Sequence, residues 1–173
     1  MIFLIRYPFD AYDRAWSPFN DEEWTQLTTK LAVDPRTHID YWPPDIIMKN
    51  AAVPKDEETP IEFYLEPPNI SDRYYLYVHF AELQKLEANE SRAFNINVNG
   101  KLLYGPVIPD YLTSTTIYST KALTGKSNYS FSIEKLENST LPPILNAIEF
   151  YSQLDFSQSE SNEDDGTYIL LFT

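Results

Sequence analysis

The chain has 173 residues, 43% hydrophobic and 15% aromatic, with thirteen prolines and four glycines, so we expect one core built mostly of short strands. Its formal net charge of −13 argues against nucleic acid or an anionic membrane surface as a partner, because either would be repelled. The sequence contains no cysteine, which excludes disulfides, thiolate metal sites and thiol catalysis.

Near the start of the chain, the segment Asp13-Arg14-Ala15-Trp16 supports two interpretations. In the first, the Trp16 ring stacks on a sugar while the charged groups bind its hydroxyls. In the second, Trp16 anchors the first strand in the core while Arg14 makes a buried or interface ion pair. We favour the second interpretation.

Residues 21–33 also support two interpretations. Trp24, Leu27 and Leu31 recur at spacings of three and four behind an acidic start, which is typical of a short helix. The interspersed threonines favour an irregular turn followed by a strand instead. Beyond this segment, His38 has no second histidine or cysteine close in sequence, so we expect a surface residue rather than a metal ligand.

Residues 41–44, Tyr-Trp-Pro-Pro, predict a rigid aromatic corner, because each proline fixes its own φ angle and extends the residue before it. The corner supplies two candidate ligand-binding residues, Tyr41 and Trp42. Residues 45–53 follow as a short apolar segment, and residues 61–65 predict a strand.

The strongest strand signals lie in the middle of the chain. Residues 74–80 are aromatic and β-branched, and residues 94–98 alternate apolar side chains with asparagine. Asn99-Gly100 tolerates the positive φ angles of a type I′ turn. We therefore expect a tight hairpin that continues into residues 101–104.

Two features of this central region need separate interpretation. Leu83 and Leu86 are three residues apart among polar residues, which suits one helical turn over an open sheet edge. His79 falls inside the central strand, where we expect a hydrogen-bonded structural histidine.

The last third of the chain continues the β pattern. Residues 112–120 predict an exposed, threonine-rich strand, residues 129–133 an amphipathic strand, and residues 138–151 a turn followed by an apolar strand. Residues 157–165 carry like charges and no core-forming side chains, which predicts a disordered linker.

Enzyme chemistry has little support in the sequence. The four glycines are too widely spaced for a phosphate-binding loop, and neither an HExxH motif nor a nucleophile elbow occurs. Glu82, Glu87 and Glu90 are candidate paired carboxylates, but the sequence places no two of them across a cleft. We expect no catalytic residue, no metal site and no cofactor.

Four Asn-X-Ser/Thr sequons occur, each at a predicted loop or strand edge. They begin at Asn69, Asn89, Asn128 and Asn138. Their number in a short chain favours a glycosylated extracellular domain.

Five blocks of sequence resemble the malectin-like domain found outside the membrane in plant leucine-rich-repeat receptor kinases. The blocks are RYPFDAYDRAW at 6–16, YWPPDIIMKNAAVP at 41–54, YYLYVHFAELQ at 74–84, NESRAFNINVNG at 89–100 and STLPPILNAIEFY at 139–151. Their order and spacing make the resemblance specific, and Ala15 and Ala93 are small departures from the family pattern.

The resemblance implies an all-β fold, an antiparallel β-sandwich of the malectin or carbohydrate-binding-module type with short helical turns. It places the domain at residues 6–155, after a start at 1–5 that lies outside the match and before an acidic tail at 156–173 that we expect to be disordered. It also implies the second of two malectin-like halves, in a chain without the receptor's first half, signal peptide, leucine-rich repeats, membrane helix and kinase.

The function implied is non-catalytic recognition on the extracellular side of the plasma membrane. The expected partners are the preceding malectin-like half, the leucine-rich repeats and a protein co-receptor. Oligosaccharide binding is the alternative, with Trp16, Tyr41, Trp42, Tyr74 and Tyr75 as candidate residues. We favour protein recognition, because most of these aromatic side chains are expected to serve the core or a contact with a neighbouring domain.

Overall fold

The computed structural model describes residues 3–4, 10, 12–35, 41–153 and 170–172, and the structural statements below refer to these residues. His38 and the predicted linker at 157–165 lie outside them. The single described helix is α1 (Asp45–Met48). The strands are β1 (Phe3–Leu4), β2 (Ala15–Trp16), β3 (Trp24–Thr28), β4 (Asp34–Pro35), β5 (Asn50–Pro54), β6 (Ile61–Leu65), β7 (Tyr74–Phe80), β8 (Phe94–Val98), β9 (Lys101–Val107), β10 (Thr113–Tyr118), β11 (Tyr129–Lys135), β12 (Ala147–Ser152) and β13 (Leu170–Phe172).

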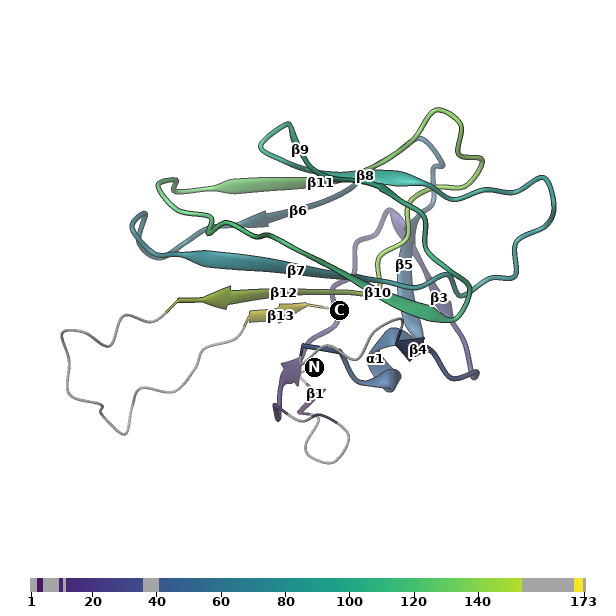
Figure 1. Ribbon diagram of the computed structural model, residues 1–173, viewed down its shortest axis with the longest axis horizontal. Coiled ribbons are helices and arrows are strands. Elements are labelled where there is room, and N and C mark those ends of the chain that lie inside the picture. Colours follow the sequence, from purple (N-terminus) through teal and green to yellow (C-terminus); the bar gives the residue numbers. More distant parts are fainter. Residues whose placement is uncertain (1–2, 5–9, 11, 36–40, 154–169, 173) are drawn as a thin grey trace.

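Two sheets pack face to face as a β-sandwich, as the sequence predicts (Figure 1). One sheet has the strand order β13-β12-β7-β10-β4, and the other has the order β6-β11-β8-β9. All pairings in the two sheets are antiparallel except that of β4 with β10, which is parallel. The short ribbon of β3 and β5 runs across the strand direction of both sheets.

Alternating apolar residues give each sheet one buried face. In β7, Leu76, Val78 and Phe80 have no exposed surface. They face the other sheet, where Phe131 of β11 packs its ring 5.5 Å from that of Phe150 on β12. The strands predicted at 61–65, 74–80, 94–98 and 129–133 are therefore confirmed, with their apolar residues in one shared core.

The hairpin between β8 and β9 turns at Asn99-Gly100, as predicted. Both residues have positive φ angles, 49° for Asn99 and 71° for Gly100. The turn is attached to β11, because the Asn99 side chain accepts a hydrogen bond from the Ser130 backbone N–H at 3.2 Å.

Within residues 21–33 a turn is followed by strand β3 at Trp24–Thr28, so the helical interpretation of this segment is wrong and the alternative of a turn and a strand is confirmed. β3 pairs with β5 along its whole length, from Trp24 opposite Pro54 to Thr28 opposite Asn50. A helix would bury Leu31 on the same face as Trp24, whereas Leu31 is 54% exposed and Trp24 is 9% exposed. Pairing with β5 has overridden the helical spacing.

Two further expectations are corrected. The segment with Leu83 and Leu86 is a loop without a helical turn, since Glu82 forms a bridge with Tyr111 and the chain stays extended there. The threonine-rich strand β10 is not an exposed edge, because it lies between β7 and β4 and buries Ser114 and Ile117.

The end of the chain differs from the expected disorder at one place. β13, at residues 170–172, pairs antiparallel with β12 at the edge of the five-stranded sheet. Across the described residues, no helix is long and apolar enough to cross a membrane.

Candidate functional site

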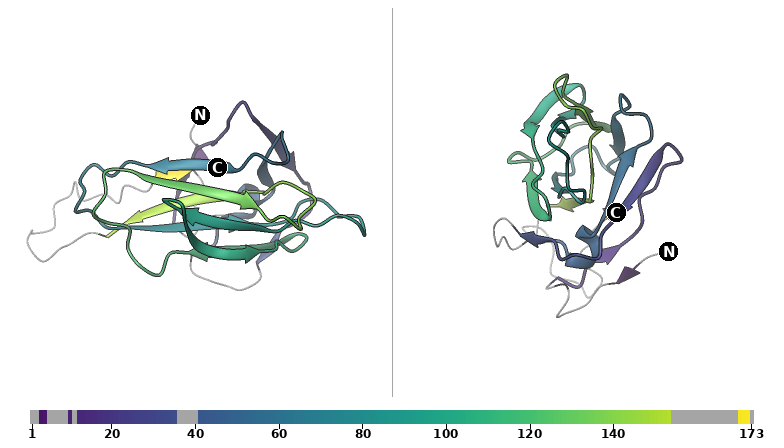
Figure 2. Two further views of the ribbon diagram at one scale, coloured as in Figure 1. Left: turned by 90° about the horizontal axis from the view of Figure 1, so that it is seen from above. Right: turned by 90° about the vertical axis from the view of Figure 1, so that its right-hand side faces the viewer.

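The outer face of the five-stranded sheet is polar and aromatic. Tyr75, Tyr77 and His79 alternate with the core residues of β7, so their side chains point away from the core. Glu149 of β12 lies opposite Tyr77 in the register, between the buried residues Ile148 and Phe150. The N-terminal segment, in purple and blue in Figure 2, lies along one side of the sandwich.

Glu149 is the centre of a buried charge network on this face. It has no exposed surface. Its Oε1 accepts hydrogen bonds from Arg14 Nη1 and the Tyr151 hydroxyl, each at 2.8 Å, and its Oε2 accepts one from His79 Nε2 at 2.7 Å. The other ring nitrogen of His79, Nδ1, lies within hydrogen-bonding distance of the Thr116 hydroxyl at 2.8 Å. The prediction of a structural histidine is confirmed.

Arg14 connects this network to the start of the chain. Its Nε donates to the Asp10 carboxylate at 2.9 Å, and the Arg14 and Asp10 side chains are almost completely buried. Trp16, which has no exposed surface, donates to Asp10 from its indole nitrogen at 3.3 Å. The interpretation of Trp16 as a core anchor beside a buried Arg14 ion pair is therefore confirmed, and Trp16 cannot stack on a sugar.

The charges inside this network shift its pKa values. Burial by itself would raise the pKa of Glu149, but the hydrogen bond from His79 and the charges of His79 and Arg14 outweigh it and hold the pKa below the ordinary 4.5. Burial, the Glu149 charge and the hydrogen bond to Glu149 raise the pKa of Tyr151. Glu149 is thus ionised and Tyr151 neutral at physiological pH.

Arg14 also holds the aromatic corner against the sheet. Its Nη1 donates to the backbone carbonyl of Tyr41 at 3.5 Å, and its Nη2 donates to that of Trp42. One guanidinium therefore fixes the backbone of both Tyr41 and Trp42, whose side chains have different surroundings. Tyr41 joins a group of tyrosines, and Trp42 lines a pocket.

The tyrosine cluster consists of Tyr12, Tyr41, Tyr77, Tyr118 and Tyr151. The Tyr41 ring stacks on that of Tyr12 with centroids 5.9 Å apart, and it contacts Tyr77 at 5.1 Å and Tyr151 at 5.4 Å. Tyr77 in turn stacks on Tyr118 at 5.4 Å. Tyr12, Tyr41 and Tyr118 are between 41% and 53% exposed, so the cluster is an accessible aromatic surface over the buried charge network.

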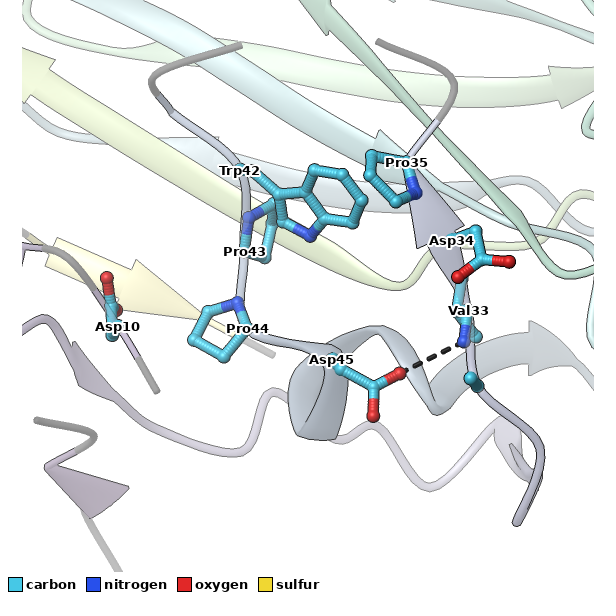
Figure 3. Close-up of a pocket in the computed structure, with 9 residues that line it drawn as sticks. Asp10, Val33, Asp34, Pro35, Trp42, Pro43, Pro44 and Asp45 are labelled. Atoms are coloured by element: carbon cyan, nitrogen blue, oxygen red, sulfur yellow. Dashed lines mark hydrogen bonds between the residues drawn. The ribbon is translucent and has the colours of Figure 1, made fainter. Parts of the chain in front are cut away.

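The Trp42 pocket lies beside the tyrosine cluster, between β4 and the start of α1 (Figure 3). Its volume is about 330 Å³. The aromatic corner forms one wall and Asp34 lies on the opposite side, while Asp45 follows Pro44 and bridges to the backbone of Val33. The lining residues are Asp10, Ala32, Val33, Asp34, Pro35, Trp42, Pro43, Pro44 and Asp45.

The structure separates the five candidate sugar-stacking residues. Trp16 and Tyr74 are core residues, with 0% and 9% of their surface exposed. Tyr75 is half-buried in β7. Tyr41 and Trp42 are accessible, but the Tyr41 ring is already packed against three other tyrosines.

Several residues of the site were not singled out from the sequence. The tyrosines of the cluster other than Tyr41, together with Glu149, come from four separate segments. The alternation in YYLYVHF contained a signal for Tyr77, because it puts that tyrosine on the face opposite Leu76 and Val78. No comparable pattern marks Tyr12.

The carboxylates considered for glycoside hydrolysis have structural contacts. Glu82 is 2% exposed and accepts a hydrogen bond from Arg92 Nε at 2.6 Å. The Glu90 carboxylate accepts one from the Glu87 backbone N–H at 2.8 Å. Among the residues that the structure describes, no group of three or more His, Cys, Asp or Glu side chains is placed to hold a metal ion.

The four sequon asparagines are all exposed and lie outside the strands. They form two pairs in space. The Asn69 loop meets the Asn128 loop, where the Gly125 N–H donates to the Ile70 carbonyl at 2.7 Å. The Asn89 and Asn138 loops are joined by Ser91, whose hydroxyl donates to the Asn138 carbonyl at 3.2 Å.

Comparison with known proteins identifies the family. The profile of the malectin-like domain matches residues 2–153. The chain belongs to the malectin-like domain family. Its all-β sandwich and the resemblance of its sequence blocks are thereby confirmed.

Relatives of this malectin-like domain are receptor-like kinases of Arabidopsis thaliana. The probable LRR receptor-like serine/threonine-protein kinase At5g59680 is 43% identical over 93% of this chain, and the LRR receptor-like serine/threonine-protein kinase IOS1 is 37% identical over 92%. In each case the match covers 18% of the relative. The chain therefore spans less than a fifth of the length of these receptors.

Solved structures show the same fold. The ANX2 ectodomain from Arabidopsis thaliana matches 83% of this chain and 45% of its own with a TM-score of 0.65 and 16% identity. A crystal structure of the plant peptide RALF23 in complex with FER and LLG2 matches 86% of this chain and 45% of its own, with a TM-score of 0.63 and 12% identity. At these identities the likeness establishes the fold.

Proposed function

We propose that this malectin-like domain is a non-catalytic recognition module on the extracellular side of a plant receptor-like kinase, where it contributes to ligand or co-receptor binding in signalling. The observation that carries the proposal is the match to receptor-like kinases over 93% of the chain at up to 43% identity. The match covers 18% of the length of such a receptor.

The position within a receptor follows from the lengths of the matches. The chain corresponds to 45% of the ANX2 ectodomain, which is the share expected of one of two tandem halves. This supports a preceding malectin-like half as the partner of the domain at residues 6–155. The exposed sequons support placement outside the cell, with glycans at Asn69, Asn89, Asn128 and Asn138.

The aromatic surface favours a protein or peptide ligand over a sugar. A sugar-stacking ring needs one free face, and the Tyr41 ring, although 41% exposed, already packs against Tyr12, Tyr77 and Tyr151. Partly exposed tyrosines on a rigid sheet are typical of protein interfaces. The related fold of FER occurs in a complex with a peptide and a second protein, which supports the same class of ligand.

A binding screen tests the proposal against oligosaccharide recognition. The chain, secreted from plant cells, is immobilised and probed with secreted plant peptides and receptor ectodomains, and in parallel with a cell-wall glycan array. We expect saturable binding to a peptide or ectodomain and no specific glycan signal. Each binding interaction that is detected is measured again with the Trp42→Ala variant. Tyr64→Ala serves as the control, because Tyr64 is a 59% exposed tyrosine on the other sheet.

The outcome that overturns the proposal is binding to an oligosaccharide that Trp42→Ala abolishes without lowering the melting temperature. In that case the domain is a carbohydrate-binding module. Loss of the same signal in Tyr64→Ala as well would indicate a different sugar-binding surface.

A further inference from the structure

The Trp42 pocket combines an aromatic wall with an acidic one. Trp42, Pro43 and Pro44 form the first wall, the Asp34 carboxylate lies across the hollow, and the Asp45 carboxylate follows Pro44 between the two (Figure 3). None of the described residues that line the pocket is a lysine, arginine or histidine. The pocket is therefore an aromatic cavity of negative charge.

The three carboxylates around the pocket are not equivalent. Asp10 is buried and its charge is balanced by Arg14. Asp45 forms an ion pair with Lys49 and accepts a hydrogen bond from the Val33 N–H at 3.0 Å. Asp34 is exposed, and within the part of the chain that the structure describes no cationic side chain pairs with its carboxylate.

The pocket is built on fixed backbone. Asp34 belongs to β4, whose N–H donates to the Leu112 carbonyl at 2.9 Å and whose residues pair with β10. Trp42 is held by its carbonyl on the Arg14 guanidinium. The exposed Asp34 carboxylate and the Trp42 indole are thus held on opposite sides of one cavity, which is the arrangement that binds a cation between an aromatic face and a negative charge.

We propose that the Trp42 pocket binds an arginine side chain of the protein or peptide partner, with the guanidinium packed against Trp42 and hydrogen-bonded to Asp34. The inference rests on the proposed function and names the chemistry of the ligand. A guanidinium suits the site better than an ammonium, because its planar group packs on an aromatic ring and pairs with a carboxylate through two N–H groups. The net charge of −13 attracts a basic partner over longer distances.

Asp45, which lines the pocket beside Pro44, has a lowered pKa. Burial by itself would raise the pKa of Asp45, but the hydrogen bonds from Lys49 and Val33 and the Lys49 charge outweigh it and hold the pKa below the ordinary 3.8.

A peptide titration tests the pocket directly. The probe is a capped peptide of alternating arginine and glycine, and its counterpart carries citrulline, which has the shape of arginine without the charge. Affinity is measured by calorimetry for the wild-type chain, Asp34→Asn, Trp42→Phe and Trp42→Ala. Glu57→Gln is the matched control, because it removes one charge from an exposed residue of the β5–β6 loop, outside the pocket.

We expect Asp34→Asn to weaken binding of the arginine peptide by about tenfold. Trp42→Ala should weaken it more than Trp42→Phe, because phenylalanine keeps a ring for the guanidinium. Glu57→Gln should leave the affinity within about twofold of wild type, and the citrulline peptide should not bind detectably. The melting temperature of Asp34→Asn should equal that of wild type, because its carboxylate is exposed.

Equal losses in Asp34→Asn and Glu57→Gln would show general attraction of a basic peptide to an acidic protein and would overturn the assignment. Binding of the citrulline peptide with unchanged affinity would do the same. If a partner from the screen binds both wild type and Asp34→Asn equally, the pocket assignment fails while the proposed function stands.

Discussion

At the scale of single residues, Arg14 joins several separate segments of the chain. Its guanidinium pairs with Asp10 and Glu149 and donates to the carbonyls of Tyr41 and Trp42. It also lies over the Trp16 ring, 5.1 Å from its centroid. One side chain therefore attaches both the N-terminal segment and the aromatic corner to the sheet.

Replacing Arg14 should destabilise the domain strongly. Arg14→Ala leaves Glu149 and Asp10 buried without their cation, and breaking such a pair costs about 3–5 kcal/mol. Urea denaturation measures the free energy of unfolding. Arg73→Ala is the control, because Arg73 is exposed and should change that free energy by less than about 0.5 kcal/mol. Similar values for the two variants would contradict a central role for Arg14.

The lowered pKa of Glu149 predicts acid sensitivity. A carboxyl whose pKa is lower in the folded than in the unfolded state contributes stability above the unfolded value, here near the ordinary 4.5, and loses it as the pH falls through the folded value. The free energy of unfolding should thus be level at neutral pH and decline below pH 4.5. Glu149→Gln should flatten this decline when the free energy of unfolding of both proteins is measured by urea denaturation across this pH range, although Asp10 and Asp45 retain contributions of the same sign. Identical slopes would disprove the assignment to Glu149.

Only part of the buried charge network around Arg14 could be predicted from the sequence. The sequence indicates that Arg14 is buried in an ion pair, because it stands beside Trp16 in an aromatic segment. It does not indicate Glu149, which is 135 positions away, because no local rule connects the two residues. Asp34 was missed for the same reason, since the pocket forms only when β4 pairs with β10.

At the scale of elements, the sequence predicted the conformations that depend on neighbouring residues. The hairpin of β8 and β9 depends on Asn99-Gly100, whose positive φ angles are a property of two adjacent residues. The helices expected from the spacing at 21–33 and at Leu83 and Leu86 do not form, because both segments pair with residues distant in the sequence. Glu82 shows this clearly, since its partner Arg92 and the Tyr111 bridge both lie outside its own segment.

The turn at Gly100 can be tested without disturbing any packing. No atom lies within 4 Å of the position that a Cβ would take, so Gly100→Ala changes only the backbone preference. At a φ of 71° an alanine costs about 1–2 kcal/mol of folding free energy. Thermal or urea denaturation should show this loss, and Lys101→Ala, at the next exposed position, should show almost none. A neutral Gly100→Ala would rule out a positive φ at this turn.

At the scale of the whole molecule, period-two patterning was sufficient to predict a sandwich, because each main strand buries alternate residues. It could not predict the order of the strands in the sheets. Nor could it predict that the outer face of one sheet would bury Glu149 and His79, since both depend on a cover formed by the N-terminal segment.

The paired sequon loops give a prediction for the secreted protein. When the chain is produced behind a signal peptide, peptide mass spectrometry should find glycans at Asn69, Asn89, Asn128 and Asn138, because all four are exposed. Each Asn→Gln variant should lose one glycan and leave the other three. The purified, unglycosylated chain should resist modification at Asn89 in vitro, since the Ser91 of that sequon is hydrogen-bonded to the Asn138 loop. Complete absence of glycans from the secreted protein would contradict the prediction.

The unequal burial of the three tryptophans makes the pocket observable by its own fluorescence. Trp16 and Trp24 are enclosed, at 0% and 9% exposure, whereas Trp42 is partly exposed and lines the cavity. Emission at long wavelength, and the fraction quenched by acrylamide, should therefore come from Trp42 alone. Entry of a ligand can then be followed on the unlabelled protein, because shielding of a single indole shifts its emission to shorter wavelength.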